Sequence, residues 1–240
     1  MTASLSRILF HTLLCVAVWT WGPAALAGEI GNALEKARVD GLLTREEAVA
    51  IERRVEEARS RSLPTDSLAA KVHEGLAKRM PGQAIVRAVD LMCEDYSFAR
   101  SVLGRAGSSP SLQDVAAVGD SLRLGLTRAE LSELAGYDPA VSAAMLATAA
   151  TARAYLNSIR FAPSLSSDLL RQGILSASLT PPWARLFRVV QRARLAGLAD
   201  AAVAEAAART LAEGGEPSDL LHALGFTGRD LRRVPDESDK

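Results

Sequence analysis

Three carboxylates at Asp90, Glu94 and Asp95 form the group in the sequence that is best placed for acid–base chemistry. Asp90 and Glu94 are four residues apart, so they share one face of a predicted helix and could bind a cation or transfer a proton. Glycoside hydrolysis usually requires only two carboxylates. The group is therefore compatible with a hydrolase acting on peptidoglycan or polysaccharide, and equally with a solvated acidic helix face.

A second charged feature is an arginine ridge formed by Arg185, Arg188 and Arg192, which are spaced i, i+3 and i+7 along a predicted helix shortly after Trp183. Residues 139–199 contain seven arginines, no lysine and a single acidic residue, a net charge of +6. Because arginine and tryptophan are favoured interface anchors, these four residues predict docking of an acidic protein partner. Two alternatives stay open: an anionic membrane surface, or internal pairing with the chain's own acidic helices.

Other catalytic and metal-binding patterns are absent from the sequence. His73 and His222 are far apart, no HxxxH or CxxC spacing occurs, and no G-x-S-x-G nucleophile motif is present. The glycine-rich stretch 104–109 lacks the lysine of a phosphate-binding loop. We therefore expect no metal and no cofactor, and we favour a protein that is not an enzyme.

The composition is that of a folded chain. Of 240 residues, 48% are hydrophobic, 23% are charged and 5% are aromatic, which excludes a disordered or collagen-like chain. Twenty-eight basic residues balance 28 acidic ones, so the overall charge gives no argument for nucleic-acid binding. Composition leaves the oligomeric state open.

Residues 1–27 have the layout of a secretory signal peptide. Arg7 precedes an apolar run over residues 8–21, and the small residues of the Ala-Leu-Ala sequence at 25–27 predict cleavage before Gly28. The run is shorter than the roughly 20 residues that span a membrane, although an uncleaved anchor is the alternative. We therefore expect an exported protein, periplasmic or extracellular, with its partner in the bacterial cell envelope.

Cys93 is the one cysteine that follows the predicted leader, so no intramolecular disulfide is expected there. It follows Val89 and Met92 in a helical pattern, which favours a buried, small apolar side chain. A reactive thiol or a disulfide between chains is the alternative.

The rest of the chain predicts an all-α fold of about a dozen short helices. Apolar residues recur at intervals of three and four, and no stretch alternates with the period of a strand. We expect one helical domain over residues 28–234, with a sub-boundary near 104–110, followed by a polar tail over 235–240.

Local start signals place many of these helices. Thr44 and Glu47 form a capping-box pattern, and Asp138 followed by Pro139 predicts the start of a long alanine-rich helix. Further starts are expected at Pro64, Pro81, Thr180–Pro181 and Glu216–Pro217.

The starts share a loose repeated element, an apolar residue followed directly by Thr, Pro or Ala and, a few positions further on, by an aliphatic residue. It occurs at Leu43–Thr44, Leu63–Pro64, Met80–Pro81, Leu126–Thr127, Leu179–Thr180 and Leu198–Ala199, with a weaker copy at Glu216–Pro217. Gly125 and Gly197 precede two copies, where a helix-ending glycine belongs. The element predicts a short helical-repeat solenoid, but start signals in an orthogonal bundle would also recur.

These observations lead to a non-enzymatic interaction or scaffold protein of the bacterial cell envelope, docking through the arginine-rich helix. The alternative is an envelope hydrolase that uses the paired carboxylates at Asp90 and Glu94. A third possibility is a subunit that folds fully only within a larger assembly.

Overall fold

The computed structural model describes residues 23–105 and 109–226, and every regular element in those residues is helical. The predicted all-α class is therefore confirmed. The elements are α1 (Pro23–Val39), α2 (Arg45–Ser60), α3 (Thr65–Ala77), α4 (Gly82–Leu103), α5 (Leu112–Arg123), α6 (Arg128–Gly136), α7 (Ala143–Ser158), α8 (Pro163–Leu175), the 3₁₀ helix η1 (Pro181–Arg185), α9 (Leu186–Leu195), α10 (Asp200–Ala212) and α11 (Pro217–Ala223).

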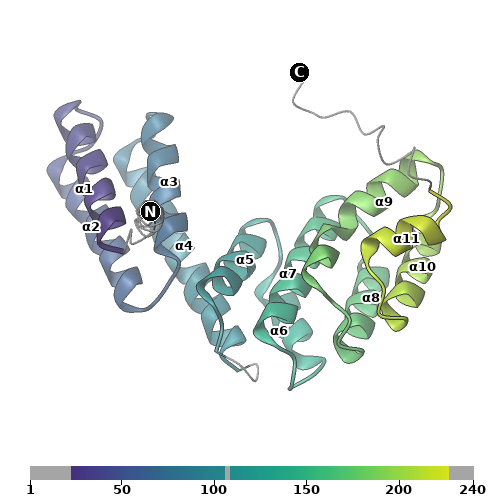
Figure 1. Cartoon of the computed structure of the whole chain (residues 1–240). Coiled ribbons are helices and arrows are strands. Elements are labelled where there is room, and N and C mark those ends of the chain that lie inside the picture. The colour runs from purple at the N-terminus through teal and green to yellow at the C-terminus, as the bar shows by residue number, and fades with distance from the viewer. Residues whose placement is uncertain (1–22, 106–108, 227–240) are drawn as a thin grey trace, which may run out of the picture.

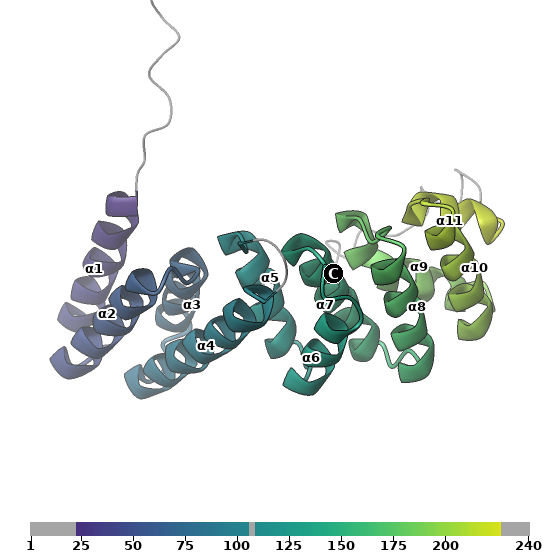
Figure 2. The same cartoon turned by 90° about the horizontal axis from the view of Figure 1, so that it is seen from below.

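The helices follow one another along an open, curved row (Figure 1). α1 to α4 form one limb, α5 and α6 lie at the bend, and α7 to α11 form the other limb; the view from below shows the same order (Figure 2). Each helix packs against near neighbours in the chain, as in the pairs α2–α4, α4–α5, α5–α7, α7–α8 and α8–α10. Segments distant in sequence therefore stay distant in space.

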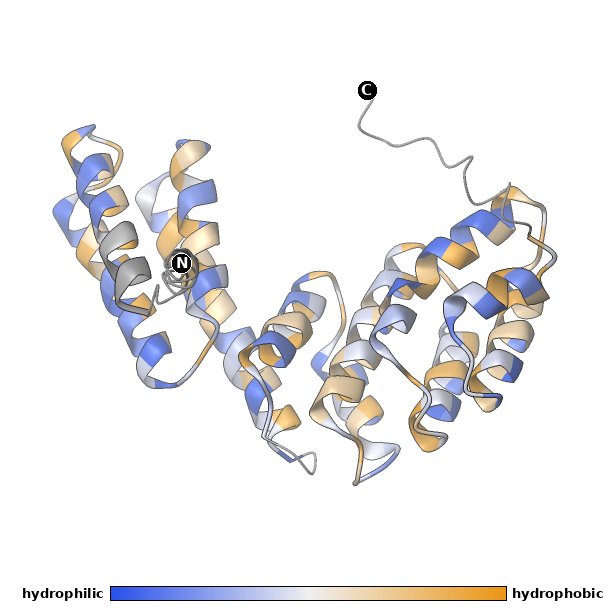
Figure 3. Cartoon of the chain, viewed as in Figure 1, coloured by the Kyte–Doolittle hydropathy of each residue, from blue (hydrophilic) through white to orange (hydrophobic). Residues whose placement is uncertain are grey.

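Apolar side chains from all the helices join in one continuous core. Hydrophobic and hydrophilic residues interleave along each helix (Figure 3), so that one stripe faces the neighbouring helices and the other faces solvent. The core consists mainly of Leu, Val, Ile and Ala, and its two largest fully buried side chains are Trp183 and Tyr96. Abundant alanine, especially in α7, lets the helices approach one another closely.

The predicted helix starts are confirmed wherever the repeated element occurs, because each copy stands directly before a helix. The second residue of each copy from Leu43–Thr44 to Leu198–Ala199 is the N-cap of the element that follows, and Glu216 is the N-cap of α11. At α2 the capping box is complete: Thr44 Oγ1 accepts from the Glu47 backbone N–H at 3.2 Å, and Glu47 Oε2 accepts from the Thr44 N–H at 2.9 Å.

The predicted start at Asp138–Pro139 was wrong. Asp138 Oδ1 accepts a hydrogen bond from the Ala140 backbone N–H at 2.8 Å, which closes a local turn instead of a helix end. The alanine-rich helix α7 begins five residues later, where Ser142 Oγ accepts from the Met145 N–H. Both aspartate and serine are N-cap residues, and the local sequence does not show which of the two will cap the helix.

The stretch after Thr180 also differs from the prediction. A single helix was expected from Pro181 to Gly197, but the chain forms η1 first and α9 only from Leu186. Consecutive prolines at 181 and 182 fix φ at about −65° in the first turn, a value that both a 3₁₀ turn and an α-helix accept, so the sequence did not distinguish the two.

Several helices end with a residue in the left-handed conformation. The apolar residue that follows it donates its backbone N–H to a carbonyl of the same helix. Gly125 (φ +105°) and Gly197 (φ +81°) occupy this position, as predicted. The next residue closes the motif, with Leu126 N–H donating to Ser121 O at 3.0 Å and Leu198 N–H donating to Ala193 O at 2.9 Å. The same bond is made by the backbone N–H of Leu63 and of Met80, so at these four starts the apolar residue closes the preceding helix; after α8, Ser178 makes the bond instead.

The predicted leader and tail fall mainly outside the described residues. α1 begins at Pro23, so the predicted cleavage point before Gly28 lies within this helix. The predicted sub-boundary at 104–110 lies between α4 and α5, which pack directly against each other. Within residues 23–105 and 109–226, no helix is both long enough and apolar enough to span a membrane.

Candidate functional site

The arginine ridge lies on one face of η1 and α9, in the second limb of the molecule (Figure 1). Arg185 and Arg188 are exposed and Arg192 is half-buried. Arg188 lies over the Phe187 ring, with 5.8 Å between its guanidinium carbon and the ring centroid, and Arg192 lies over Phe226 at 5.4 Å. In the part of the chain that the structure describes, none of the three arginines forms an ion pair.

Leu195 extends the ridge by one further turn, three residues after Arg192 and seven after Arg188. Its side chain is 90% exposed, the largest value among the exposed large hydrophobic residues of the described chain. An isolated exposed leucine needs no explanation. Here it continues a row of arginines that have no ion pair among the described residues, so the face of α9 offers both positive charge and apolar area. The sequence pattern contained this leucine, but only its exposure distinguishes it from a core residue.

Trp183 lies inside the fold, apart from the ridge. Its side chain is 0% exposed, and its indole Nε1–H donates to the carbonyl of Gly215 at 3.2 Å. The prediction of Trp183 as a binding residue is therefore corrected, because a buried ring offers no surface to a partner. Its role is to fix η1 against the turn between α10 and α11.

Two other arginines of the basic region form ion pairs with acidic residues of the protein itself, as the internal-pairing alternative expected. Arg194 forms a two-pronged ion pair with Asp200, with Nε–Oδ1 and Nη2–Oδ2 distances of 2.8 and 2.7 Å. Its Nη1 also donates to the carbonyl of Ile159 at 2.7 Å. Arg194 therefore links α9, α10 and the end of α7, and its charge is compensated by Asp200.

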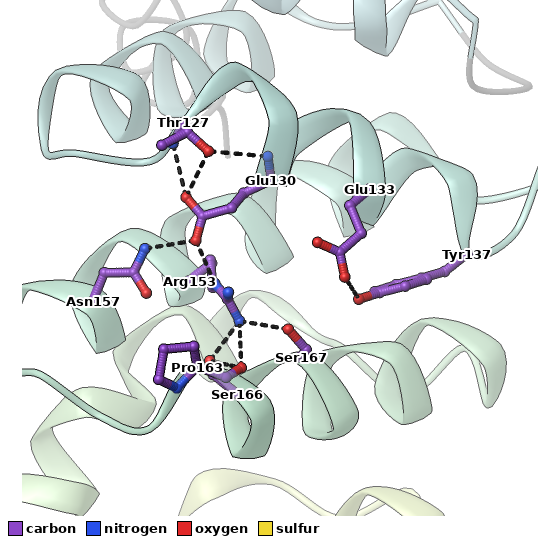
Figure 4. Close-up of polar contacts among 9 residues, drawn as sticks. All are labelled: Thr127, Glu130, Glu133, Tyr137, Arg153, Asn157, Pro163, Ser166 and Ser167. Carbon is purple, nitrogen blue, oxygen red and sulfur yellow. Dashed lines mark hydrogen bonds and ion pairs between the residues drawn. The ribbon is translucent and has the colours of Figure 1, made fainter.

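Arg153 is the second of these arginines, and it is the buried centre of a polar network (Figure 4). Its side chain is 7% exposed, and its Nε donates to Glu130 Oε1 at 3.0 Å. Its Nη1 donates to the carbonyl of Pro163 and to the hydroxyls of Ser166 and Ser167, at 3.0, 2.5 and 2.9 Å. One guanidinium therefore joins α6, α7 and α8.

Glu130 is the acidic member of this network and closes the capping box of α6. Burial alone would raise the pKa of Glu130. The hydrogen bonds that it accepts from the Thr127 backbone, from Asn157 and from Arg153 outweigh burial and lower its pKa to about 2. Sequence reasoning missed this residue as a centre of contacts, because only the capping-box spacing from Thr127 could have marked it.

The three predicted carboxylates take different positions around α4. Asp90 Oδ1 is 2.7 Å from Arg54 Nε on α2, and Asp95 Oδ1 is 3.5 Å from Arg128 Nη2 on α6. Glu94 is exposed and has no ion pair within the described residues. Asp90 and Glu94 therefore line the same groove, whereas Asp95 is not part of its lining and pairs with Arg128 on α6.

This charged groove has a volume of about 440 Å³ and runs between α2 and α4, with α6 at one side. Its lining combines arginines and carboxylates, so most of its charges already have partners within the protein. The lining residues are Arg54, Glu57, Ala58, Arg61, Asp90, Cys93, Glu94, Ser97 and Arg128.

Cys93 lies in this groove and is half-buried. Burial is the main cause that raises the pKa of its thiol, and the negative charge of Asp90 raises it further. A raised pKa lowers the fraction of reactive thiolate at neutral pH. The position agrees with the small apolar role more closely than with that of a nucleophile.

The described residues contain no group of three or more His, Cys, Asp or Glu side chains placed to hold a metal ion. His73 is half-buried on α3, and His222 is exposed on α11, in the other limb. No protein-family model, no curated protein and no solved structure matches the chain.

Proposed function

We propose that this protein is a non-enzymatic interaction scaffold that docks an acidic protein partner through the face of α9. The observation that carries the proposal is the row formed by Arg185, Arg188, Arg192 and Leu195. Within residues 23–105 and 109–226, these three arginines have no counter-ion, and together with a leucine that is 90% exposed they occupy one face of η1 and α9. Unpaired guanidinium groups beside apolar area have the composition of an interface centre.

The arrangement of the helices supports this role. We interpret the open row in Figure 1 as a short helical-repeat solenoid, in which each unit is one helix plus one tight turn. In a solenoid each repeat contacts only the neighbouring repeats, and the whole row presents an extended face to partners. The recurrence of the left-handed helix end and its apolar neighbour supports this interpretation over an orthogonal bundle.

A protein partner fits the ridge better than a lipid surface does. Each arginine near an anionic membrane contributes about 1 kcal/mol, and three are a weak anchor without a second signal. The stacking of Arg188 and Arg192 on aromatic rings limits their motion. A partly ordered guanidinium loses less entropy when it forms directed, two-pronged bonds with carboxylates.

The place of action that we propose is the bacterial cell envelope. Its support is the sequence alone: the basic residue, the apolar run and the small residues before Gly28. Mass measurement of the chain recovered from the periplasm tests this step separately, because cleavage before Gly28 fixes the mass.

The hydrolase alternative has weaker support. Asp90 and Glu94 line the same groove, which is what a pair of catalytic carboxylates needs. Asp90, however, is engaged by Arg54 at 2.7 Å. A zymogram on cell-wall material tests this alternative. If the native chain clears the material and Glu94→Gln does not, the hydrolase function replaces the one that we propose.

Site-directed photo-cross-linking in intact cells tests the docking face. A benzoylphenylalanine residue at position 195 reports on the ridge, and one at position 91 is the matched control because Leu91 is also exposed, at 60%, on α4. We expect a discrete protein adduct from position 195 and none of the same mass from position 91.

The adduct must depend on the ridge charges. Replacing Arg185, Arg188 and Arg192 together by Gln should abolish it, while replacing the exposed arginines Arg45 and Arg171 should leave it unchanged. An adduct that persists without the ridge arginines, or a lipid adduct in place of a protein, would overturn the proposal.

A further inference from the structure

A second positively charged surface lies in the other limb of the molecule, where the ends of α2 and α4 meet. It is a groove with a volume of about 470 Å³. The lining contains three arginines and no carboxylate, in contrast to the charged groove beside it. The lining residues are Arg61, Leu63, Ser97, Arg100, Ser101, Gly104 and Arg105.

Two of the three guanidinium groups are positioned by neutral acceptors. Arg61 Nη2 donates to Ser97 Oγ at 2.7 Å, and Arg100 Nη1 donates to the carbonyl of Ser62 at 2.8 Å. Within the described residues, Arg61, Arg100 and Arg105 have no ion pair. Each bond fixes a guanidinium without neutralising it, and a guanidinium has five N–H donors, so most of them stay available.

Helix ends reduce this positive charge but do not cancel it. The C-termini of α2 and α4 both lie at the groove, with Arg61 and Gly104 as their C-caps. Each helix C-terminus carries about half a negative elementary charge. Three arginines against two such ends leave about +2, which matches a phosphate monoester with its charge of nearly −2.

We propose that this groove binds the phosphate group of a small, hydroxyl-bearing molecule. Planar guanidinium forks pair with phosphate oxygens in a two-pronged geometry, which a point charge cannot reproduce. Arg61 is the C-cap of α2, Arg100 lies in the last turn of α4 and Arg105 follows the C-cap of that helix, so the arginines line the groove from two helix ends.

The remaining lining indicates hydroxyl groups on the ligand. Ser97 and Ser101 donate their hydroxyl protons to the carbonyls of Cys93 and Phe98, at 2.5 and 2.8 Å. Ser101 Oγ is therefore left as an acceptor, whereas Ser97 Oγ already accepts from Arg61 and has one lone pair left. The neighbouring charged groove shares Arg61 and Ser97 and adds the unpaired carboxylate of Glu94. Hydrogen-bond acceptors beside an anion site fit a sugar phosphate, because the sugar hydroxyls can donate to these acceptors while the phosphate group pairs with the arginines.

A titration of the full chain tests the site. The ligands are glucose 6-phosphate, inorganic phosphate and glucose at constant ionic strength, and binding is followed by calorimetry and by backbone amide NMR shifts. We expect glucose 6-phosphate to bind more tightly than inorganic phosphate, glucose alone not to bind, and the shifts to centre on Ser101 and Gly104. Arg61→Gln combined with Arg105→Gln should weaken binding at least about tenfold, since each removes a charge-assisted contact.

The control is the pair Arg45→Gln and Arg171→Gln, which removes equal charge from exposed sites outside the groove. Equal weakening in the control, or no binding by the unmodified chain, would overturn the proposal. A third outcome would assign the phosphate group to a lipid. In that case the chain binds phosphatidic-acid vesicles but not glucose 6-phosphate, and Arg61→Gln combined with Arg105→Gln abolishes the binding to vesicles. This groove and the ridge on α9 lie in different limbs, so either can fail without the other.

Discussion

Glu130 Oε1 and Arg153 Nε lie 3.0 Å apart and connect α6 to α7, although the two residues are 23 positions apart in sequence. The same carboxylate caps its own helix through Thr127, and the same guanidinium continues to α8 (Figure 4). The pair is therefore a joint of three helices at the bend of the molecule. No buried side-chain polar atom of the described chain lacks a partner, so any break in the joint creates one.

Replacement of Arg153 by Ala should destabilise the protein by about 2–4 kcal/mol, because Ser166 and Glu130 would lose their shared donor in a mostly buried site. The exposed pair Arg209–Glu205 provides the matched control, and Arg209→Ala should cost less than about 0.5 kcal/mol. Urea unfolding followed by circular dichroism measures both values. Equal effects of the two substitutions would contradict the structural role of Arg153.

Acid should weaken this joint in a defined range of pH. The pKa of Glu130 is about 2 in the folded chain, below its ordinary value of 4.5. Between these values the unfolded chain binds the proton more readily, so stability falls as the pH decreases from 4.5 towards 2. With allowance for solvent screening, the loss is about 1–2 kcal/mol.

Comparison of the native chain with Glu130→Gln isolates this contribution. The difference in the free energy of unfolding should be constant above pH 5 and shrink as the pH falls towards 2. Glu205→Gln, at an exposed ion pair on α10, is the matched control for the removal of one carboxylate. If the difference in the free energy of unfolding between the two chains does not depend on pH, Glu130 is not the group that causes the loss of stability in acid.

Much of the fold follows from short-range signals. The box formed by Thr44 and Glu47 and the left-handed turns at Gly125 and Gly197 lie within a few residues of the helix ends that they define, so the sequence pattern located them. The start at Asp138 failed because a turn and a helix N-cap use the same side-chain chemistry. Only tertiary packing decides between the two.

The site was less predictable, because exposure and pairing depend on residues far apart in sequence. Arg153 and Arg192 have the same chemistry and lie in the same basic region, yet one is buried against Glu130 and the other lies over Phe226. Likewise, Trp183 at a helix start could have been an interface anchor, but Gly215, 32 residues later, accepts its indole proton. Charge counting cannot make these distinctions.

Gly119 on α5 should be intolerant of a side chain, because an added Cβ would collide with the ring of Tyr96 on α4. That ring is fully buried, and its hydroxyl donates to Asp120 Oδ1 at 3.1 Å, so the ring has little room to move. Gly119→Ala should therefore cost about 1–3 kcal/mol despite the better helix propensity of alanine. Gly136→Ala, where the added Cβ meets no atom within 4 Å, should be neutral or slightly stabilising. Thermal unfolding of the two variants decides the point, and similar melting temperatures would argue against close packing of α4 on α5.

The thiol of Cys93 should react slowly at neutral pH, since burial and the charge of Asp90 both raise its pKa. Asp90→Asn removes that charge and leaves Arg54 beside the groove, so the rate of reaction with a disulfide reagent at pH 7.5 should rise roughly two- to threefold. Cys15→Ser in both chains leaves Cys93 as the single reactive thiol.

The pH–rate profile separates this electrostatic effect from simple opening of the groove. If Asp90 acts through charge, Asp90→Asn shifts the midpoint of the profile to lower pH and leaves the plateau rate at high pH unchanged. If the substitution instead loosens the packing of α2 on α4, the plateau itself rises, because access to the ionised thiol then increases. A raised plateau with an unchanged midpoint would therefore refute the influence of Asp90 on Cys93 and assign its ion pair with Arg54 a purely structural role.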